Sequence, residues 1–244
     1  GMGGKYPIPQ EYRCRNVKAN VYETNKAPEK VPNEICRVKA AAKGKGIFEL
    51  GANGDKDIVY YWVTSKGGYR FHTVNGLDEA AVDWFLANYY QPYYDRYKKY
   101  FEDGTIKGFF FDEPEFWAWW GPTLEKELKA RGENIGELLT ALKFKHSDPQ
   151  IQAKAFYRYL DARSVVWGRT MYGRQSEWCK RHGVFSSGHF MEHEQCYYSH
   201  TLAAGDVLQQ MKYVYVPGVD LVCRQYYPNY RTKKTYQIKF GQLP

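Results

Sequence analysis

Hydrophobic and polar residues alternate in the first part of the chain, and uninterrupted apolar runs replace this pattern further along. The alternating stretches at residues 14–22 and 35–40 are separated by prolines and predict half-exposed β-strands. The short segment at residues 47–50 follows a glycine pair and precedes a turn cluster at residues 51–55. We therefore predict a small β-rich segment over residues 1–55 and a larger domain over residues 56–244.

The larger domain opens with strand-like and helix-like segments in turn. The continuous apolar run Ile58–Val63 is typical of a buried strand. Apolar residues at helical spacing then extend from about residue 78 to 101, and Pro92 is expected to kink or split this helix. A second, largely apolar run, Ile106–Phe111, follows Asp103-Gly104 and is also typical of a buried strand, covered on both faces. This strand–helix–strand order predicts a βαβ unit in which the two strands are parallel.

The same rhythm continues to about residue 223. Helices are predicted at 122–130, 135–142, 151–181 (with a possible break at Gly173) and 205–213, and strands at 184–192 and 217–223. Repeated alternation of strands and helices predicts an α/β fold built on a parallel sheet.

The strand at 106–111 ends abruptly in two carboxylates and a proline. Pro114 cannot donate a hydrogen bond to a neighbouring strand, so Asp112 and Glu113 are expected at the carboxyl edge of the sheet. In α/β folds that edge is where ligands bind and chemistry occurs. The alternative is an ordinary strand-to-loop transition with surface acids.

Tryptophans follow the two carboxylates within a few residues: Trp117, Trp119 and Trp120. A flat indole can stack on the C–H face of a pyranose ring, so carboxylates beside indoles suit a sugar-binding site. The alternative, that the tryptophans belong to the core, stays open at this point.

A second acidic cluster lies in the strand predicted at 184–192. If the strand continues to Glu194, the side chains of Glu192 and Glu194 share one face because strand side chains alternate. Gly188 allows close approach of another backbone, and His189 is suited to hydrogen bonding with a hydroxyl. A metal site and a capped strand end are alternatives, but the His-Glu-His spacing lacks the ligand set of a zinc site, so we expect no metal.

Glycoside hydrolysis requires two carboxyl groups, one protonated to act as the acid and one ionised to act as the base or nucleophile. We assign Glu113 as the general acid, since burial against Phe111 and Trp117 would raise the pKa of its carboxyl. Glu192 is the candidate base or nucleophile, with Glu194 in reserve. Asp112, the three tryptophans, His189, Glu194 and Asp220 are candidates for substrate binding.

Composition argues against several other classes of function. The 244 residues carry a net charge of +8, but the basic residues are scattered among acids, which favours a solvated surface over a nucleic-acid partner. The basic, aromatic segment Arg224–Lys239 keeps nucleic-acid binding as a weaker alternative. No apolar stretch is long enough to span a bilayer, so no membrane partner is expected. Five cysteines without a CxxC pair argue against a disulfide framework or zinc ribbon, and nothing indicates a cofactor.

Three strand-end motifs carry a resemblance to a known group of enzymes. The segments 106–114 (IKGFFFDEP), 188–193 (GHFMEH) and 213–220 (YVYVPGVD) resemble those of (β/α)8-barrel glycoside hydrolases, nearest to the α-L-rhamnosidase-like bacterial enzymes that degrade polysaccharides. The resemblance covers roughly Asp57 to Val222 and implies a TIM-type barrel with Glu113 and Glu192 as the carboxylate pair at its mouth. It also implies a carbohydrate substrate and a secreted or periplasmic enzyme, although the chain does not begin with a signal peptide.

The pattern contains fewer strands than a whole barrel requires. A complete barrel has eight strands in about 250 residues, and few convincing strands follow the β-rich start here. We therefore expect an incomplete barrel, part of a larger enzyme. A glycoside hydrolase is the leading hypothesis, and a non-catalytic carbohydrate-binding protein or inactive barrel fragment is the alternative.

Overall fold

The computed structural model describes residues 8–23, 26–42, 48–50, 57–64, 73–114, 118–190 and 206–218. The chain divides into two compact units, each made of two stretches of sequence. Unit 1 comprises residues 1–81 and 117–166, and unit 2 comprises residues 82–116 and 167–244. The division at residue 55 that the sequence pattern predicts stays a prediction.

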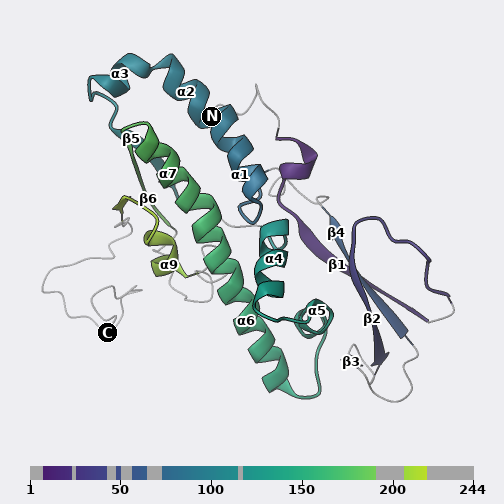
Figure 1. Ribbon diagram of the computed structural model, residues 1–244. Coiled ribbons are helices and arrows are strands. Elements are labelled where there is room, and N and C mark those ends of the chain that lie inside the picture. Colours follow the sequence, from purple (N-terminus) through teal and green to yellow (C-terminus); the bar gives the residue numbers. More distant parts are fainter. Residues whose placement is uncertain are drawn as a thin grey trace, which may run out of the picture. The chain divides into compact units, whose positions relative to one another are not determined.

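Unit 1 contains a four-stranded antiparallel sheet, shown in purple and blue in Figure 1. The strands lie in the order β1-β4-β2-β3. Their bounds are Asn16–Glu23 for β1, Glu34–Ala42 for β2, Phe48–Leu50 for β3 and Asp57–Thr64 for β4. β1, β2 and β4 were predicted from their apolar patterns, and β3 lies in the segment predicted to be β-rich. A short 3-10 helix, Gln10–Tyr12, precedes them.

The partners of β4 differ from those that the sequence predicts. β4 pairs antiparallel with β1 on one side and with β2 on the other, so the βαβ unit predicted from residues 58–111 does not form. A continuous apolar run predicts a strand but does not specify the direction of the strands beside it. The same run therefore fits an antiparallel sheet as well as a parallel one.

Helix α5 (Ile135–Lys143) packs on the sheet of unit 1 through two close contacts. The Thr140 hydroxyl donates to the Gly136 carbonyl oxygen at 2.7 Å, which leaves it free to accept from the hydroxyl of the fully buried Tyr61 at 2.6 Å. A Cβ on Gly136 would lie 2.3 Å from Cγ1 of Val38, so the missing side chain lets helix and strand approach. Helices α4 (Pro122–Ala130) and α6 (Pro149–Trp167) follow the predicted ranges and supply further core residues.

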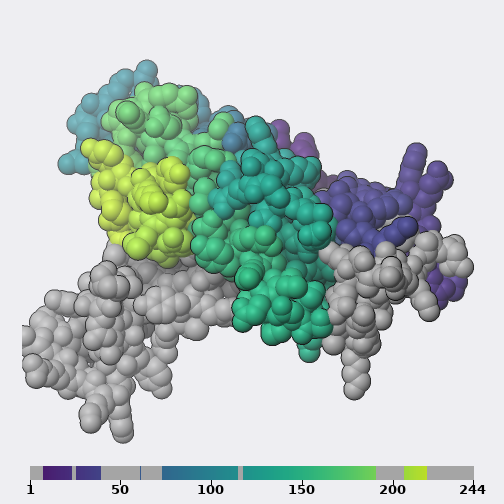
Figure 2. Space-filling view, turned by 60° about the horizontal axis from the view of Figure 1, so that its bottom comes forward, coloured from purple at the N-terminus to yellow at the C-terminus, as the bar shows by residue number. Residues whose placement is uncertain are grey.

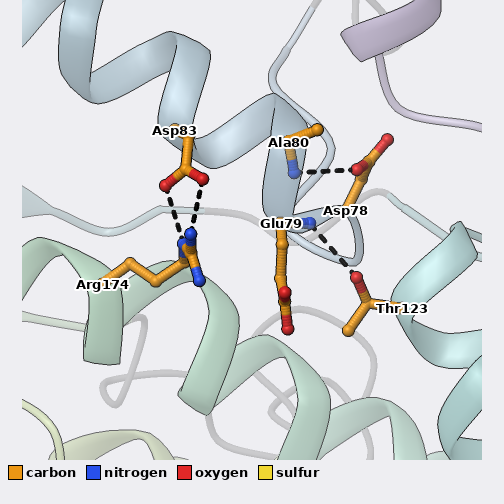
Figure 3. Close-up of polar contacts among 6 residues, drawn as sticks. All are labelled: Asp78, Glu79, Ala80, Asp83, Thr123 and Arg174. Carbon is orange, nitrogen blue, oxygen red and sulfur yellow. Dashed lines mark hydrogen bonds and ion pairs between the residues drawn. The ribbon is translucent and has the colours of Figure 1, made fainter.

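A run of helical segments leads from unit 1 into unit 2: α1 (Glu79–Phe85), a π-helical turn (Leu86–Tyr90), α2 (Gln91–Arg96) and α3 (Lys98–Glu102). Asp78 caps α1 by accepting from the Ala80 N–H at 3.1 Å, as Figure 3 shows. The widened turn directly precedes α2, in which Pro92 removes one helical donor, so the predicted interruption is present.

The second long helix of the chain is also interrupted. α6 passes into a π-helical segment, Gly168–Gly173, and then into α7 (Arg174–Arg181), so the helix changes type at Gly173, where the sequence indicates a possible break, but its backbone stays helical. Within unit 2 the Arg174 guanidinium binds the Asp83 carboxylate through two hydrogen bonds of 2.8 and 2.5 Å, which ties α7 to α1 (Figure 3).

Unit 2 contains a three-stranded parallel sheet in the order β5-β6-β7. The strands are Gly108–Asp112, Phe185–His189 and Val216–Pro217, and helix α9 (Val207–Met211) precedes the last. In the space-filling view, the yellow-green residues of α9 and β7 lie beside the green residues of α7 (Figure 2). The strands at 106–111 and 184–192 and their parallel relationship were predicted.

One face of the parallel sheet is covered by aromatic side chains from the helices. The Phe109 ring contacts the rings of Tyr90 at 4.2 Å, Phe101 at 5.6 Å and Trp178 at 5.6 Å between centroids. Phe110, which points to the other face, is 64% exposed. The prediction that this strand is buried on both faces was therefore wrong, and only alternate residues meet the helices.

The protein is a mixed α/β protein with a small parallel sheet and several helices. A barrel, complete or partial, stays a prediction. No helix in the described part of the chain is long and apolar enough to cross a membrane.

Candidate functional site

The carboxyl end of β5 holds two adjacent acids, as the sequence predicts. Asp112 is the last residue of the strand, and Glu113 and Pro114 follow it. Glu113 has a φ angle of 41°, a left-handed conformation that is uncommon for residues with a side chain. Its N–H donates to the His189 carbonyl oxygen at 3.2 Å, so the turn is fastened to the neighbouring strand. Strained backbone of this kind is concentrated at functional sites.

His189 lies directly beside Asp112 across the parallel pair. The two residues are register partners, and the His189 Nε2 lies 3.1 Å from the Asp112 Oδ1. The side chain of His189 is 11% exposed and that of Asp112 is 79% exposed. A buried imidazole therefore holds one oxygen of an exposed carboxylate, whose other oxygen faces solvent.

The other nitrogen of the His189 ring also faces an oxygen. His189 Nδ1 lies 3.1 Å from the carbonyl oxygen of Phe190, an acceptor that cannot donate. Each ring nitrogen thus faces an oxygen, and which of the two carries the hydrogen depends on the tautomer. Such a ring is fixed in orientation, and it fixes the carboxylate in turn.

Glycine brings the strands of this edge close together. A Cβ on Gly188 would lie 2.4 Å from the Phe111 carbonyl oxygen, and the Gly188 carbonyl accepts from the Gly218 N–H at 2.9 Å. The close backbone approach predicted for Gly188 is therefore confirmed. It places the ends of β5, β6 and β7 at a common edge.

Beneath the acids lies a layer of aromatic rings. Phe111 contacts Tyr172 and Phe190 at centroid distances of 5.0 and 5.3 Å. Tyr172 is 2% exposed, and its hydroxyl has no hydrogen-bond partner among the described residues. Burial raises the pKa of this phenol well above its ordinary value, and the neighbouring Tyr90 raises it further. The layer gives the carboxyl edge an apolar floor.

Two of the predicted tryptophans lie in the described part of unit 1. Trp120 is 2% exposed, and its indole N–H donates to Glu125 at 3.3 Å. Trp120 is thus a core residue with no open face for a sugar, which is the alternative that the sequence left open. Trp119 is half-buried, and its ring stacks with Tyr159 at 6.0 Å and lies under the Arg163 guanidinium at 4.9 Å.

Other predicted site residues lie outside the described residues: Trp117, Glu192, Glu194 and Asp220. Their roles stay predictions, as does the pairing of Glu113 with Glu192. The described residues contain no group of three or more His, Cys, Asp or Glu side chains arranged to hold a metal ion.

The sequence pattern does not point to three polar side chains that the structure places in buried or pocket positions. The unpaired hydroxyl of Tyr172 lies in a helix whose pattern indicated only core packing, so no signal marked it. Asn16 and Lys143 line a pocket of unit 1 and also escaped notice. Each is an ordinary surface residue by its local pattern, and only the fold brings them together.

The fold and the site define a mixed α/β protein with an acid pair and a histidine at the carboxyl edge of a parallel sheet. No protein-family model and no curated protein matches the sequence. Among solved structures, the chain is similar to a rhamnosidase from Novosphingobium sp. PP1Y, with a TM-score of 0.51 and 14% sequence identity. The match covers 68% of this chain and 16% of that chain, so it spans about a sixth of the other protein. The chain thus resembles part of the fold of a glycoside hydrolase.

Proposed function

We propose that the chain is part of a glycoside hydrolase and that Glu113 is its general acid. The observation that carries this proposal is the placement of Glu113, in a left-handed conformation, at the carboxyl edge of a parallel sheet beside Asp112 and His189. Edges of this kind hold the active sites of α/β enzymes, and backbone strain is concentrated there. The fold likeness to a rhamnosidase supports the same class.

In the proposed reaction the Glu113 carboxyl donates its proton to the glycosidic oxygen as the bond from that oxygen to the anomeric carbon breaks. A second carboxylate, for which Glu192 is the candidate, either takes a proton from the attacking water or attacks the anomeric carbon itself. Asp112 binds substrate hydroxyls through the oxygen that His189 leaves exposed. The substrate is a polysaccharide or an oligosaccharide.

We also propose that β5, β6 and β7 belong to a (β/α) barrel. Consecutive strands of the chain lie side by side and parallel, as in that fold. Helical aromatic residues pack on the Phe109 face, whereas Phe110 on the opposite face is exposed. In a barrel the second of these faces points to the interior and is covered by other strands.

The test is hydrolysis of a panel of rhamnosides and other glycosides by the Glu113→Gln variant. Glutamine keeps the shape and removes the acid, so kcat should fall by about 10²–10⁴-fold. Glu137→Gln, an exposed acid in α5 of unit 1, is the matched control and should keep full activity. Equal turnover by the Glu113→Gln variant and the original protein would remove the assignment. Sugar binding without turnover by the original protein would select a non-catalytic carbohydrate-binding protein instead.

A further inference from the structure

Unit 1 contains a pocket that the proposed hydrolase site does not use. Its volume is about 240 Å³, and it lies between β1, α5 and α6. Pockets for drug-sized ligands hold roughly 300–1,000 Å³. The space here therefore suits a ligand of about one six-membered ring.

The walls of the pocket are mostly apolar. Val17 of β1 and Leu139 and Leu142 of α5 supply aliphatic surface, and Trp119 and Phe156 supply aromatic surface. Phe156 is 36% exposed, so part of this apolar surface is open to solvent. A small, fully hydrated ion such as phosphate gains nothing from such walls, whereas a ligand with a ring gains by burying its apolar atoms.

The polar side chains that line the pocket are donors. The Asn16 side-chain oxygen Oδ1 accepts from the Val17 N–H at 2.8 Å, which leaves the side-chain NH2 group for a ligand. The Tyr159 hydroxyl is already used, since it donates to the Trp119 carbonyl at 2.5 Å. Lys143 adds an ammonium group, and no carboxylate lines the described pocket. Donors without acceptors select a ligand that accepts hydrogen bonds.

The charge at the pocket is positive, which also favours a ligand that accepts hydrogen bonds. Lys143 forms no ion pair with a carboxylate of the described chain, and Lys18 of β1 lies close enough to repel it. Lys143 is exposed as a residue, and partial desolvation of its ammonium and then the Lys18 charge lower its pKa. An anion bound at Lys143 would offset both effects, because it supplies the missing opposite charge.

We propose that this pocket binds a carboxylate attached to a six-membered ring, with Lys143 and Asn16 holding the carboxylate and Trp119 and Phe156 contacting the ring. Two sources supply this chemistry: a hexuronic acid unit of a glycan and an aromatic acid. The proposal rests on unit 1 alone and does not depend on the hydrolase activity proposed for unit 2.

The experiment follows the indole N–H signal of Trp119 by ¹⁵N NMR of the full chain, with the signal assigned from a Trp119→Phe variant. Galacturonate and benzoate are the two test ligands. Galactose, which has the ring without the carboxylate, and inorganic phosphate, which has charge without the ring, are the controls. We expect a saturable shift with at least one carboxylate and none with either control. Saturation by galacturonate alone identifies the glycan source, and saturation by benzoate alone identifies the aromatic one.

Variants then test the assigned contacts. Lys143→Met keeps most of the unbranched apolar stem and removes the charge, so the affinity should fall about tenfold or more, as expected for a lost charged hydrogen bond. Lys154→Met, an exposed lysine of α6 outside the pocket, should bind as the original protein does. No saturable shift with either carboxylate would overturn the proposal, as would equal binding of carboxylate and phosphate or equal weakening by the two variants.

Discussion

Gly188 lies so close to Phe111 that the neighbouring strand leaves no room for a side chain. A Cβ built on Gly188 would be 2.4 Å from the Phe111 carbonyl oxygen, and the φ angle of Gly188 is 155°. Residues with side chains rarely adopt this conformation. The pair β5–β6, which holds Asp112 and His189 in register, therefore depends on this glycine.

Gly188→Ala should lower the free energy of unfolding by about 2 kcal/mol or more, since the strands must separate and the backbone must change. Urea unfolding followed by circular dichroism measures the loss. Gly104→Ala is the matched control, because Gly104 also has a positive φ angle of 77° but has no atom within 4 Å of the added Cβ. The free energy of unfolding of Gly104→Ala should fall by about 1 kcal/mol, which is the cost of a left-handed backbone for a residue with a Cβ. Equal losses in the two variants would show that the contact with Phe111 does not matter.

Glu113→Gly should be more stable than Glu113→Ala, since both variants lack the carboxylate and only glycine relieves the backbone. The left-handed backbone at a φ angle of 41° costs a residue with a side chain about 1–2 kcal/mol. Glycine removes that cost but adds about 0.5–1 kcal/mol through the greater freedom of the unfolded chain. The expected difference between the two variants is about 0.5–1 kcal/mol in favour of glycine, measured by urea unfolding.

Glu113→Ala separates the backbone effect from the loss of the carboxylate. It removes the same acid but keeps a Cβ, so it retains the strained backbone and serves as the reference for the glycine variant. Both variants should lose the proposed hydrolysis. A glycine variant less stable than the alanine variant would mean that the turn at Glu113 is not strained.

Tyr172→Phe should be neutral or stabilising. The Tyr172 hydroxyl is buried without a partner in the described structure, so its removal relieves a desolvation cost of about 1 kcal/mol. Tyr159→Phe is the control: Tyr159 is also 2% exposed, but its hydroxyl donates to the Trp119 carbonyl. That variant should lose about 1 kcal/mol because the carbonyl is left unpaired. Equal losses would indicate that Tyr172 has a partner in solution.

Local patterns predicted the elements of this chain better than their partners. The runs Ile58–Val63 and Ile106–Phe111 are both largely apolar, and each contributes to a strand, β4 and β5. One is central in an antiparallel sheet and the other lies in a parallel sheet, because strand partners come from distant residues that apolar periodicity does not specify. At the site, too, the local sequence predicted positions but not partners. Pro114 indicated where β5 ends and so placed Asp112 and Glu113 at the carboxyl edge. The register that sets Asp112 against His189 spans more than 70 residues and required the fold.

Cys14 should make the stability of the protein fall at alkaline pH. The thiol is 2% exposed, and burial raises its pKa from 9.0 to about 11, despite opposing effects of the Thr73 hydroxyl and the Arg163 charge. Between these two values the unfolded chain loses the thiol proton while the folded chain keeps it. The unfolded state then binds fewer protons, so the free energy of unfolding decreases as pH rises. By pH 10.5 the contribution of Cys14 should be about 2 kcal/mol.

Other buried groups with raised pKa values, including Cys179 and Tyr61, add to the same trend, so the test compares variants and not absolute stabilities. Urea unfolding at pH 8.0 and pH 10.5 should show a smaller alkaline loss for Cys14→Ala than for the original protein, by about 2 kcal/mol. Alanine at position 14 lowers stability at both pH values through lost packing, and this loss cancels in the difference. The control is Ser147→Ala, an exposed residue without a titrating side chain, which should keep the full alkaline loss. If Cys14→Ala and Ser147→Ala lost the same amount between the two pH values, the Cys14 thiol would ionise equally well in the folded and unfolded chain.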